Sequence, residues 1–98
     1  MAKYEILYWQ DLPSLVEASD DDGTKKIQLS QRFQDLIDHV AMETGLAGTD
    51  DSLEKWTRGE TQERDGTAEE VVKAVADEFE AQFEDIKSAA AAAVTATD

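Results

Sequence analysis

The sequence contains no cysteine, a single proline and a single histidine among its 98 residues. Without cysteine, the chain has no disulfide, no thiolate zinc site and no cysteine nucleophile. A lone histidine excludes a relay between two imidazoles, and no glycine-rich phosphate-binding loop is present. The sequence therefore offers no recognisable catalytic motif, and we predict no catalytic residue, no cofactor and no metal.

Basic residues are also scarce. Nine Lys and Arg stand against 23 Asp and Glu, which gives a formal net charge of −14. A chain with no basic patch cannot neutralise phosphates, so nucleic acid is excluded as a partner. No apolar run approaches the roughly 18 residues that cross a membrane, and the N-terminus lacks the pattern of a secretory signal. We therefore expect a cytoplasmic protein with no membrane contact.

The acidity has two explanations, a surface for basic partners or adaptation to a salt-rich cytoplasm. The acids are spread along the chain, nine before Thr49 and fourteen after it. A surface for basic partners would be more clustered, so we favour adaptation to high salt, with solvent cations at the acidic surface. Salt then relieves a self-repulsion that weakens the compact state.

Large aliphatic residues and phenylalanine are few. Leu, Ile, Val and Phe number 20 together, which lies near the composition of disordered chains of high net charge. The periodic patterns below nevertheless predict one α+β domain over residues 1–88, followed by an Ala-rich flexible tail over 89–98. Because its core is thin, we expect help from a protein partner or from a second copy in a homodimer.

The N-terminal half alternates in a way that predicts strands. Residues 3–9 place Tyr, Ile, Leu and Trp on both faces, which is typical of a central strand covered twice. Residues 14–19 follow Pro13 as a second strand, and Asp22-Gly23 before residues 24–30 predicts a hairpin. The result is a three-stranded antiparallel meander.

The second half predicts helices. Ser30 is a good N-cap for a helix that ends at Gly45, with one apolar stripe of Phe33, Leu36, Ile37, Val40 and Ala41. A short helix is expected to be capped within 49–52. Thr67 and Glu70 form a capping box before a five-turn stripe of Val72, Val75, Phe79, Phe83 and Ile86. Residues 57–66, in particular Thr57–Glu63, are a fourth strand or a loop.

These elements predict an α+β fold in which a small antiparallel sheet of three or four strands carries two main helices. Two stretches of the sequence contain residues that could bind a metal ion. Asp35, His39 and Glu43 share one helical face, but that face lies away from the apolar stripe and points to solvent. The sequence SDDDG has consecutive Asp residues and no Glu at the calcium-loop distance, so a solvated turn explains it better.

The aromatic residues are more informative. Tyr4, Tyr8 and Trp9 fall within the first nine positions, and a thin core cannot easily bury two indoles and two tyrosines. Met42 lies nearly opposite the apolar stripe of its helix. Exposed Trp, Tyr and Met are enriched at interfaces. We therefore predict interaction residues Tyr8, Trp9, Met42 and Trp56, with the alternative that the two tryptophans pack under their own helices.

Three stretches together resemble a small prokaryotic family known only as "virulence factor", which is similar to a domain of conserved virulence factor C. They are KYEILYWQDLPS, LSQRFQDLIDHVAMETGLAGTDDSLEKW and TAEEVVKAVADEFE. The resemblance reaches to about Phe83 and rests on core and turn positions, so it implies no active residue. The residues 57–66 are more polar than this family pattern.

The sequence therefore predicts a non-enzymatic interaction or accessory module adapted to high salt. As the alternative, the resemblance implies an accessory subunit or small enzyme of folate- and corrinoid-dependent one-carbon metabolism. A different class, a small-molecule or metal-dependent enzyme with a site shared between two copies, would need His39 or the acids near it.

Overall fold

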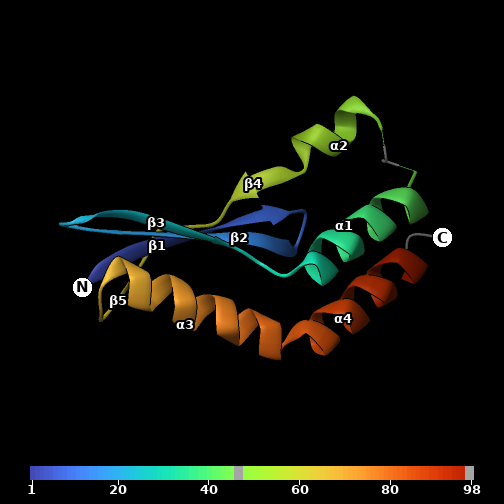
Figure 1. Cartoon of the computed structure of the whole chain (residues 1–98). Helices are drawn as coiled ribbons and strands as arrows, with labels where there is room; N and C mark the ends of the chain where they lie inside the picture. The colour runs from blue at the N-terminus through green and yellow to red at the C-terminus, as the bar shows by residue number, and fades with distance from the viewer. Residues whose placement is uncertain (46–47, 97–98) are drawn as a thin grey trace.

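The computed structural model describes residues 1–45 and 48–96, so residues 46–47 of the predicted linker lie outside the description. The elements follow the order β1 (Ala2–Trp9), β2 (Leu12–Asp20), β3 (Gly23–Gln28), α1 (Gln31–Glu43), α2 (Asp50–Glu54), β4 (Trp56–Arg58), β5 (Gln62–Arg64), α3 (Ala68–Ala81) and α4 (Phe83–Ala96). The strands form one antiparallel sheet on which helices pack (Figure 1), which confirms the predicted α+β fold.

The first three strands form the predicted meander, with β1 antiparallel to β2 and β2 antiparallel to β3. In the first hairpin Leu7 pairs with Leu15 but Tyr8 pairs with Pro13, so Ser14 is an extra residue in a β-bulge. In the second hairpin Asp20 pairs with Gly23, which places the turn one residue earlier than predicted. The φ angle of Gly23 is 142°, a conformation that favours glycine.

The fourth strand is interrupted, which resolves the question that the sequence left open. β4 pairs with the end of β1 from Leu7 to Trp9, and β5 pairs with its beginning from Ala2 to Tyr4. Between them the backbone still contacts β1, because the Gly59 N–H donates to the Ile6 carbonyl at 2.9 Å. β1 is therefore paired along both edges and is the central strand, as predicted.

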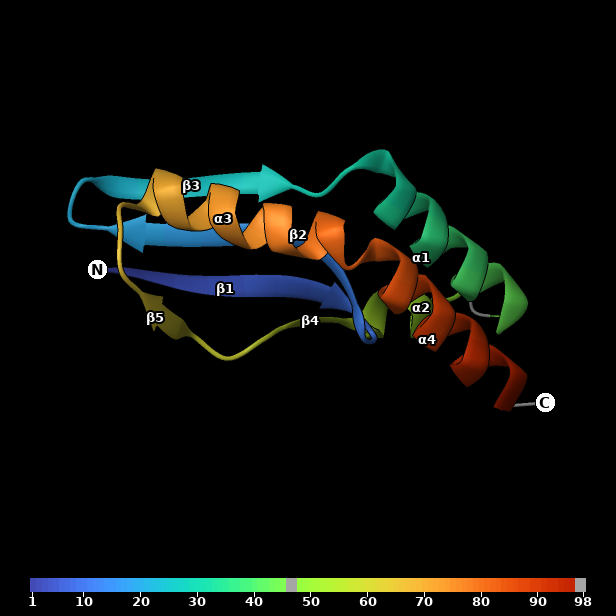
Figure 2. The same ribbon diagram turned by 90° about the horizontal axis from the view of Figure 1, so that it is seen from below.

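One face of the sheet carries α3, which runs along β1, β2 and β3 (Figures 1 and 2). Its buried side chains, Ala68, Val71, Val72, Val75 and Ala76, pack on Ala2, Ile6, Val16 and Ala18. Over β2 and β3, the opposite face carries no helix in the described part of the chain (Figure 1). The expectation that β1 is covered on both faces is thus wrong at Lys3 and Glu5, where this face is open to solvent.

The remaining helices lie beyond one end of the sheet. α1 buries the predicted stripe of Phe33, Leu36, Ile37, Val40 and Ala41, and α4 lies beside it (Figure 2). Phe33 and Phe83 join the two helices, with ring centroids 5.0 Å apart and an edge-to-face geometry. Thr44 caps α1, and Gly45 follows with a φ of 74°, as expected for the glycine that ends a helix.

The N-terminus of α3 is held by two carboxylates. The predicted capping box is confirmed, because the Glu70 N–H donates to Thr67 Oγ1 and the Thr67 N–H donates to Glu70 Oε1. Asp20, at the end of β2, adds a third bond by accepting from the Ala68 N–H at 2.7 Å. Its other oxygen accepts from the N–H groups of Asp22 and Gly23. This Ala68 bond, followed by those of the turn, lowers the pKa of Asp20.

The prediction of one continuous closing helix is wrong. The apolar stripe from Val72 to Ile86 is divided between α3 and α4, with Gln82 between them. Arg32 Nη2 donates to the Glu80 carbonyl at 2.7 Å, an oxygen that would accept from residue 84 in an unbroken helix. A side chain that inserts at a helical carbonyl is a recognised cause of a bend.

The Ala-rich segment that follows is helical as far as Ala96, where the description ends. No helix within residues 1–45 and 48–96 combines the length and the apolar character of a membrane span.

Candidate interaction surface

A row of charged side chains crosses the open face of the sheet. The strand register places Glu5 of β1 opposite Glu17 of β2, and Glu17 opposite Lys26 of β3. Arg58 of β4 joins the two carboxylates, with its Nη1 3.3 Å from Glu5 Oε2 and 3.2 Å from Glu17 Oε2. Lys26 Nζ lies 3.9 Å from Glu17 Oε2. The row therefore links four strands.

The pKa values of Arg58 and Glu5 are shifted in the directions expected for groups that are hydrogen-bonded in their charged forms. Hydrogen bonding to Glu17, more than that to Glu5, raises the pKa of Arg58. Thr61 Oγ1 donates to Glu5 Oε1 at 2.6 Å, and this bond is the main cause of the lowered pKa of Glu5. Because the carboxylates already have donors, the row is best explained as the solvent-facing side of the sheet and not as an acid–base pair.

Large apolar side chains are exposed on three successive elements at the end of the molecule away from the β2–β3 turn. Met42 of α1 is 70% exposed, Leu53 of α2 is 68% exposed and Trp56 of β4 is 36% exposed. The strand register pairs Trp56 of β4 with Trp9 of β1. We call Met42, Leu53 and Trp56 the apolar trio.

The four predicted interaction residues separate into two groups. Met42 and Trp56 are exposed, as the prediction requires. Trp9 is only 1% exposed and belongs to the core, so the alternative that it packs within its own chain is correct for this tryptophan. Tyr8 is half-buried on the face that meets α3. Leu53 was not predicted as an interaction residue. Its position in a short acidic helix with no apolar periodicity could have indicated that its side chain is exposed.

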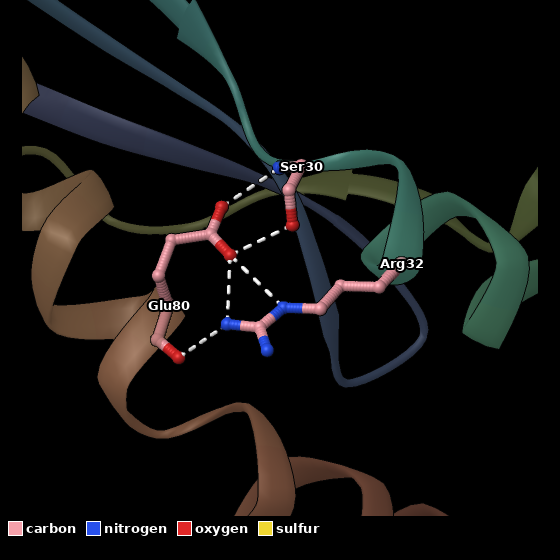
Figure 3. Close-up of polar contacts among 3 residues, drawn as sticks. All are labelled: Ser30, Arg32 and Glu80. Atoms are coloured by element: carbon pink, nitrogen blue, oxygen red, sulfur yellow. Dashed lines mark hydrogen bonds and ion pairs between the residues drawn. The ribbon is translucent and has the colours of Figure 1, made fainter.

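A cluster at the α1–α3 junction was also missed (Figure 3). Glu80 Oε2 accepts from the Ser30 N–H at 2.8 Å, and Glu80 Oε1 accepts from Ser30 Oγ at 2.7 Å. Arg32 Nε and Nη2 donate to the same Oε1 at 3.2 and 3.1 Å. Ser30 is the N-cap residue of α1 as predicted, but its hydroxyl makes no cap bond. The prediction that the Ser30 side chain caps α1 is wrong, because its hydroxyl donates to Glu80 Oε1 instead.

The contacts of Ser30, Arg32 and Glu80 stabilise the packing of the helices. Burial alone would raise the pKa of Glu80, but the bonds from Ser30 and Arg32 outweigh burial, and the pKa falls below its ordinary value. The Arg32 guanidinium carbon also lies 4.4 Å from the Phe83 ring centroid, within cation–π range. A carboxylate held by three donor groups is poorly suited to proton transfer, so we assign these residues to helix positioning.

The two metal candidates can now be placed. Asp35 and His39 lie exposed on α1, and Asp35 Oδ1 accepts a bond from Gln31 Nε2. Asp20 of the SDDDG turn directs both oxygens to backbone N–H groups. Among the described residues, no group of three or more His, Asp or Glu is arranged to hold a metal ion.

The molecule is more elongated than a compact domain of its size. Its principal extents are 46 × 27 × 20 Å and its radius of gyration is 14.4 Å, against about 13 Å for a typical domain of this length. The accessible surface is 6281 Å², and a compact monomer of 10.8 kDa exposes about 5,500 Å². The excess of roughly 800 Å² is close to the area that one partner buries in a standard protein interface.

Comparison with known proteins gives one match. A family model described as "Virulence factor" matches residues 7–89, from the second half of β1 into α4. Neither the curated proteins nor the solved structures contain a match. The resemblance carried by the N-terminal strand and the helices is therefore confirmed over most of the chain.

Proposed function

Since the chain belongs to the Virulence factor family, a family whose name specifies no reaction, we propose that it is a non-enzymatic interaction module adapted to high salt. The observation that carries the proposal is the exposure of the apolar trio Met42, Leu53 and Trp56 on successive elements. Tryptophan and methionine are enriched in the buried centres of protein interfaces. The excess surface of the elongated monomer supports the same proposal.

The proposed partner is a second copy of the chain. Two-fold dimers are the commonest oligomers, and a dimer that covers the trio would compensate for the thin core. Two chains of net charge −14 repel each other in dilute buffer. At 1 M salt the Debye length is about 3 Å, so high salt would allow two chains of this charge to associate.

Size-exclusion chromatography with light scattering in 2 M KCl tests this association. We expect a dimer for the wild-type chain and a monomer for the triple variant Met42→Gln, Leu53→Gln and Trp56→Gln. The control replaces three exposed polar residues elsewhere, Thr24→Gln, Lys25→Gln and Glu69→Gln, and should remain dimeric. A wild-type monomer at all salt concentrations, or a triple variant that dimerises normally, would contradict the proposal.

The high-salt adaptation predicts a steep salt dependence of stability. We expect the melting temperature to rise by about 10 °C or more between 0.1 and 2 M KCl, because salt screens the repulsion among the acids. A variant with Gln or Asn at five exposed acids should show a smaller rise; these are Glu43, Glu54, Glu60, Glu63 and Asp77. Differential scanning calorimetry measures both, and a salt-independent melting temperature in the wild type would refute the adaptation.

A further inference from the structure

A cavity of about 130 Å³ lies between β1 and α3, on the covered face of the sheet. It opens to solvent and is lined by three aromatic rings, two aliphatic side chains, one carboxylate and two amides. The lining residues are Tyr4, Ile6, Tyr8, Gln62, Val75, Glu78, Phe79 and Gln82. The apolar trio is not among them, so the cavity is separate from the proposed interface.

The interrupted fourth strand brings a glycine against one of the rings that line this space. The strands β4 and β5 leave residues 59–61 outside the regular ladder, beside the middle of β1. Gly59 lies against the Tyr8 ring, where an added Cβ would be 3.0 Å from Tyr8 Cε2. A glycine here lets the backbone approach the ring without displacing it into the cavity. The position of the Tyr8 ring in the cavity wall therefore depends on glycine at position 59.

Several polar groups in the wall are available to a ligand. Among the described residues none forms a hydrogen bond with the Tyr8 hydroxyl, although the ring is half-buried and burial raises the pKa of Tyr8. The Tyr4 hydroxyl donates to Gln62 Oε1 at 3.0 Å, which leaves the amide N–H donors of Gln62. Glu78 is already held by Arg64 through two hydrogen bonds. The free groups are therefore neutral donors and acceptors.

The size and charge of the cavity restrict what could occupy it. A dry cavity of about 150 Å³ holds a benzene molecule, so this one accommodates about six to nine non-hydrogen atoms if a polar substituent reaches the opening. Its lining includes no Lys or Arg, and the chain carries a net charge of −14. An anion would gain no charged partner and would be repelled. Arg64 already neutralises Glu78, so a cation gains little there.

We propose that the cavity between β1 and α3 is a binding site for a small uncharged aromatic molecule carrying a hydroxyl or amide group. The ring fits among Tyr4, Tyr8 and Phe79, where aromatic side chains favour offset or edge-to-face packing. The Tyr8 hydroxyl and the Gln62 and Gln82 amides supply the hydrogen bonds. This site is independent of the interaction module proposed above.

Three nearly isosteric probes test the proposal, namely benzamide, benzoate and benzamidinium, with phenol as a second neutral probe. The isotope-labelled full chain in 2 M KCl is titrated and followed by two-dimensional NMR. Benzamide and phenol should shift the resonances of β1, β5 and α3, with dissociation constants on the order of a few millimolar, as expected for ligands of this size. Benzoate should bind at least tenfold more weakly.

Tyr8→Phe keeps the ring and should weaken phenol binding several-fold, whereas Thr24→Gln, on β3 and outside the cavity, should leave binding unchanged. Gly59→Ala displaces the Tyr8 ring and should also weaken binding. The proposal is overturned if neither neutral probe shifts these resonances, if benzoate binds as tightly as benzamide, or if benzamidinium binds tenfold more tightly than benzamide. Because the readout does not involve association, its failure is separate from that of the proposed dimer.

Discussion

Replacing Trp9 with alanine is expected to cost about 3–5 kcal/mol of folding free energy and to lower the melting temperature by roughly 15–30 °C. Trp9 is among the largest fully buried side chains of the protein and is 1% exposed. A domain of this length has a stability of about 5–15 kcal/mol. We therefore expect Trp9→Ala to be largely unfolded in dilute buffer and to fold only in concentrated salt, as measured by circular dichroism.

Trp56→Ala is the matched control, because Trp56 lies opposite Trp9 on the neighbouring strand but is 36% exposed. The same truncation there should cost about 1 kcal/mol or less, measured below the concentration at which the chain associates. If the two variants lose the same folding free energy, Trp9 is not a core residue, and the prediction that it is an interaction residue would stand.

Glu80→Gln is expected to lower the melting temperature by about 5–15 °C, from a loss of about 1–3 kcal/mol. The substitution removes the negative charge of Glu80 in α3, to which Ser30 and Arg32 at the start of α1 both donate hydrogen bonds. The pKa of Glu80 is lowered in the folded state, so its contribution is complete above the pKa of the unfolded chain. It is lost as the pH falls through the folded pKa. The difference between wild type and variant should therefore disappear in acid, which thermal scans over a pH series will measure.

Asp77→Asn, one turn away on the exposed side of α3, provides the control for the same change of charge. It should alter the melting temperature by no more than about 2–3 °C. If Glu80→Gln is as mild as Asp77→Asn, or if its effect is constant with pH, the Ser30–Arg32–Glu80 cluster does not hold the helices together.

Most of the fold could be predicted from local patterns. The alternation in YEILYWQ fixes a strand with apolar side chains on both faces, and the repeat from Phe33 to Ala41 fixes the buried side of α1. Turn and cap residues act over three or four positions, so Gly45 and the pair Thr67 and Glu70 could be recognised directly, and the hairpin near Asp22-Gly23 was predicted to within one residue. These features depend on neighbours in the sequence, where chemistry and spacing are sufficient.

Features that depend on distant residues could not be predicted. The bend after α3 depends on Arg32 reaching the carbonyl of Glu80 across 48 positions, and nothing around Gln82 resembles a helix stop. The open face of the sheet escaped prediction because Leu7 and Trp9 place apolar side chains on the second face of β1, which is typical of a strand covered on both faces. In the candidate interface, Met42 was predicted from its position on the helix and Trp56 from its residue type. Trp9 has the same residue type as Trp56 but a buried environment that the sequence does not specify.

Asp20 joins two parts of the chain that are remote in sequence, because one carboxylate binds both the β2–β3 turn and the first N–H of α3. Opening of the hairpin would therefore remove a bond from the start of the helix, and fraying of the helix would leave the turn carboxylate without its third donor. Native-state hydrogen exchange detects such coupling as segments that open together. The tip of the hairpin and the first turn of α3, remote in sequence, are thus linked through one carboxylate.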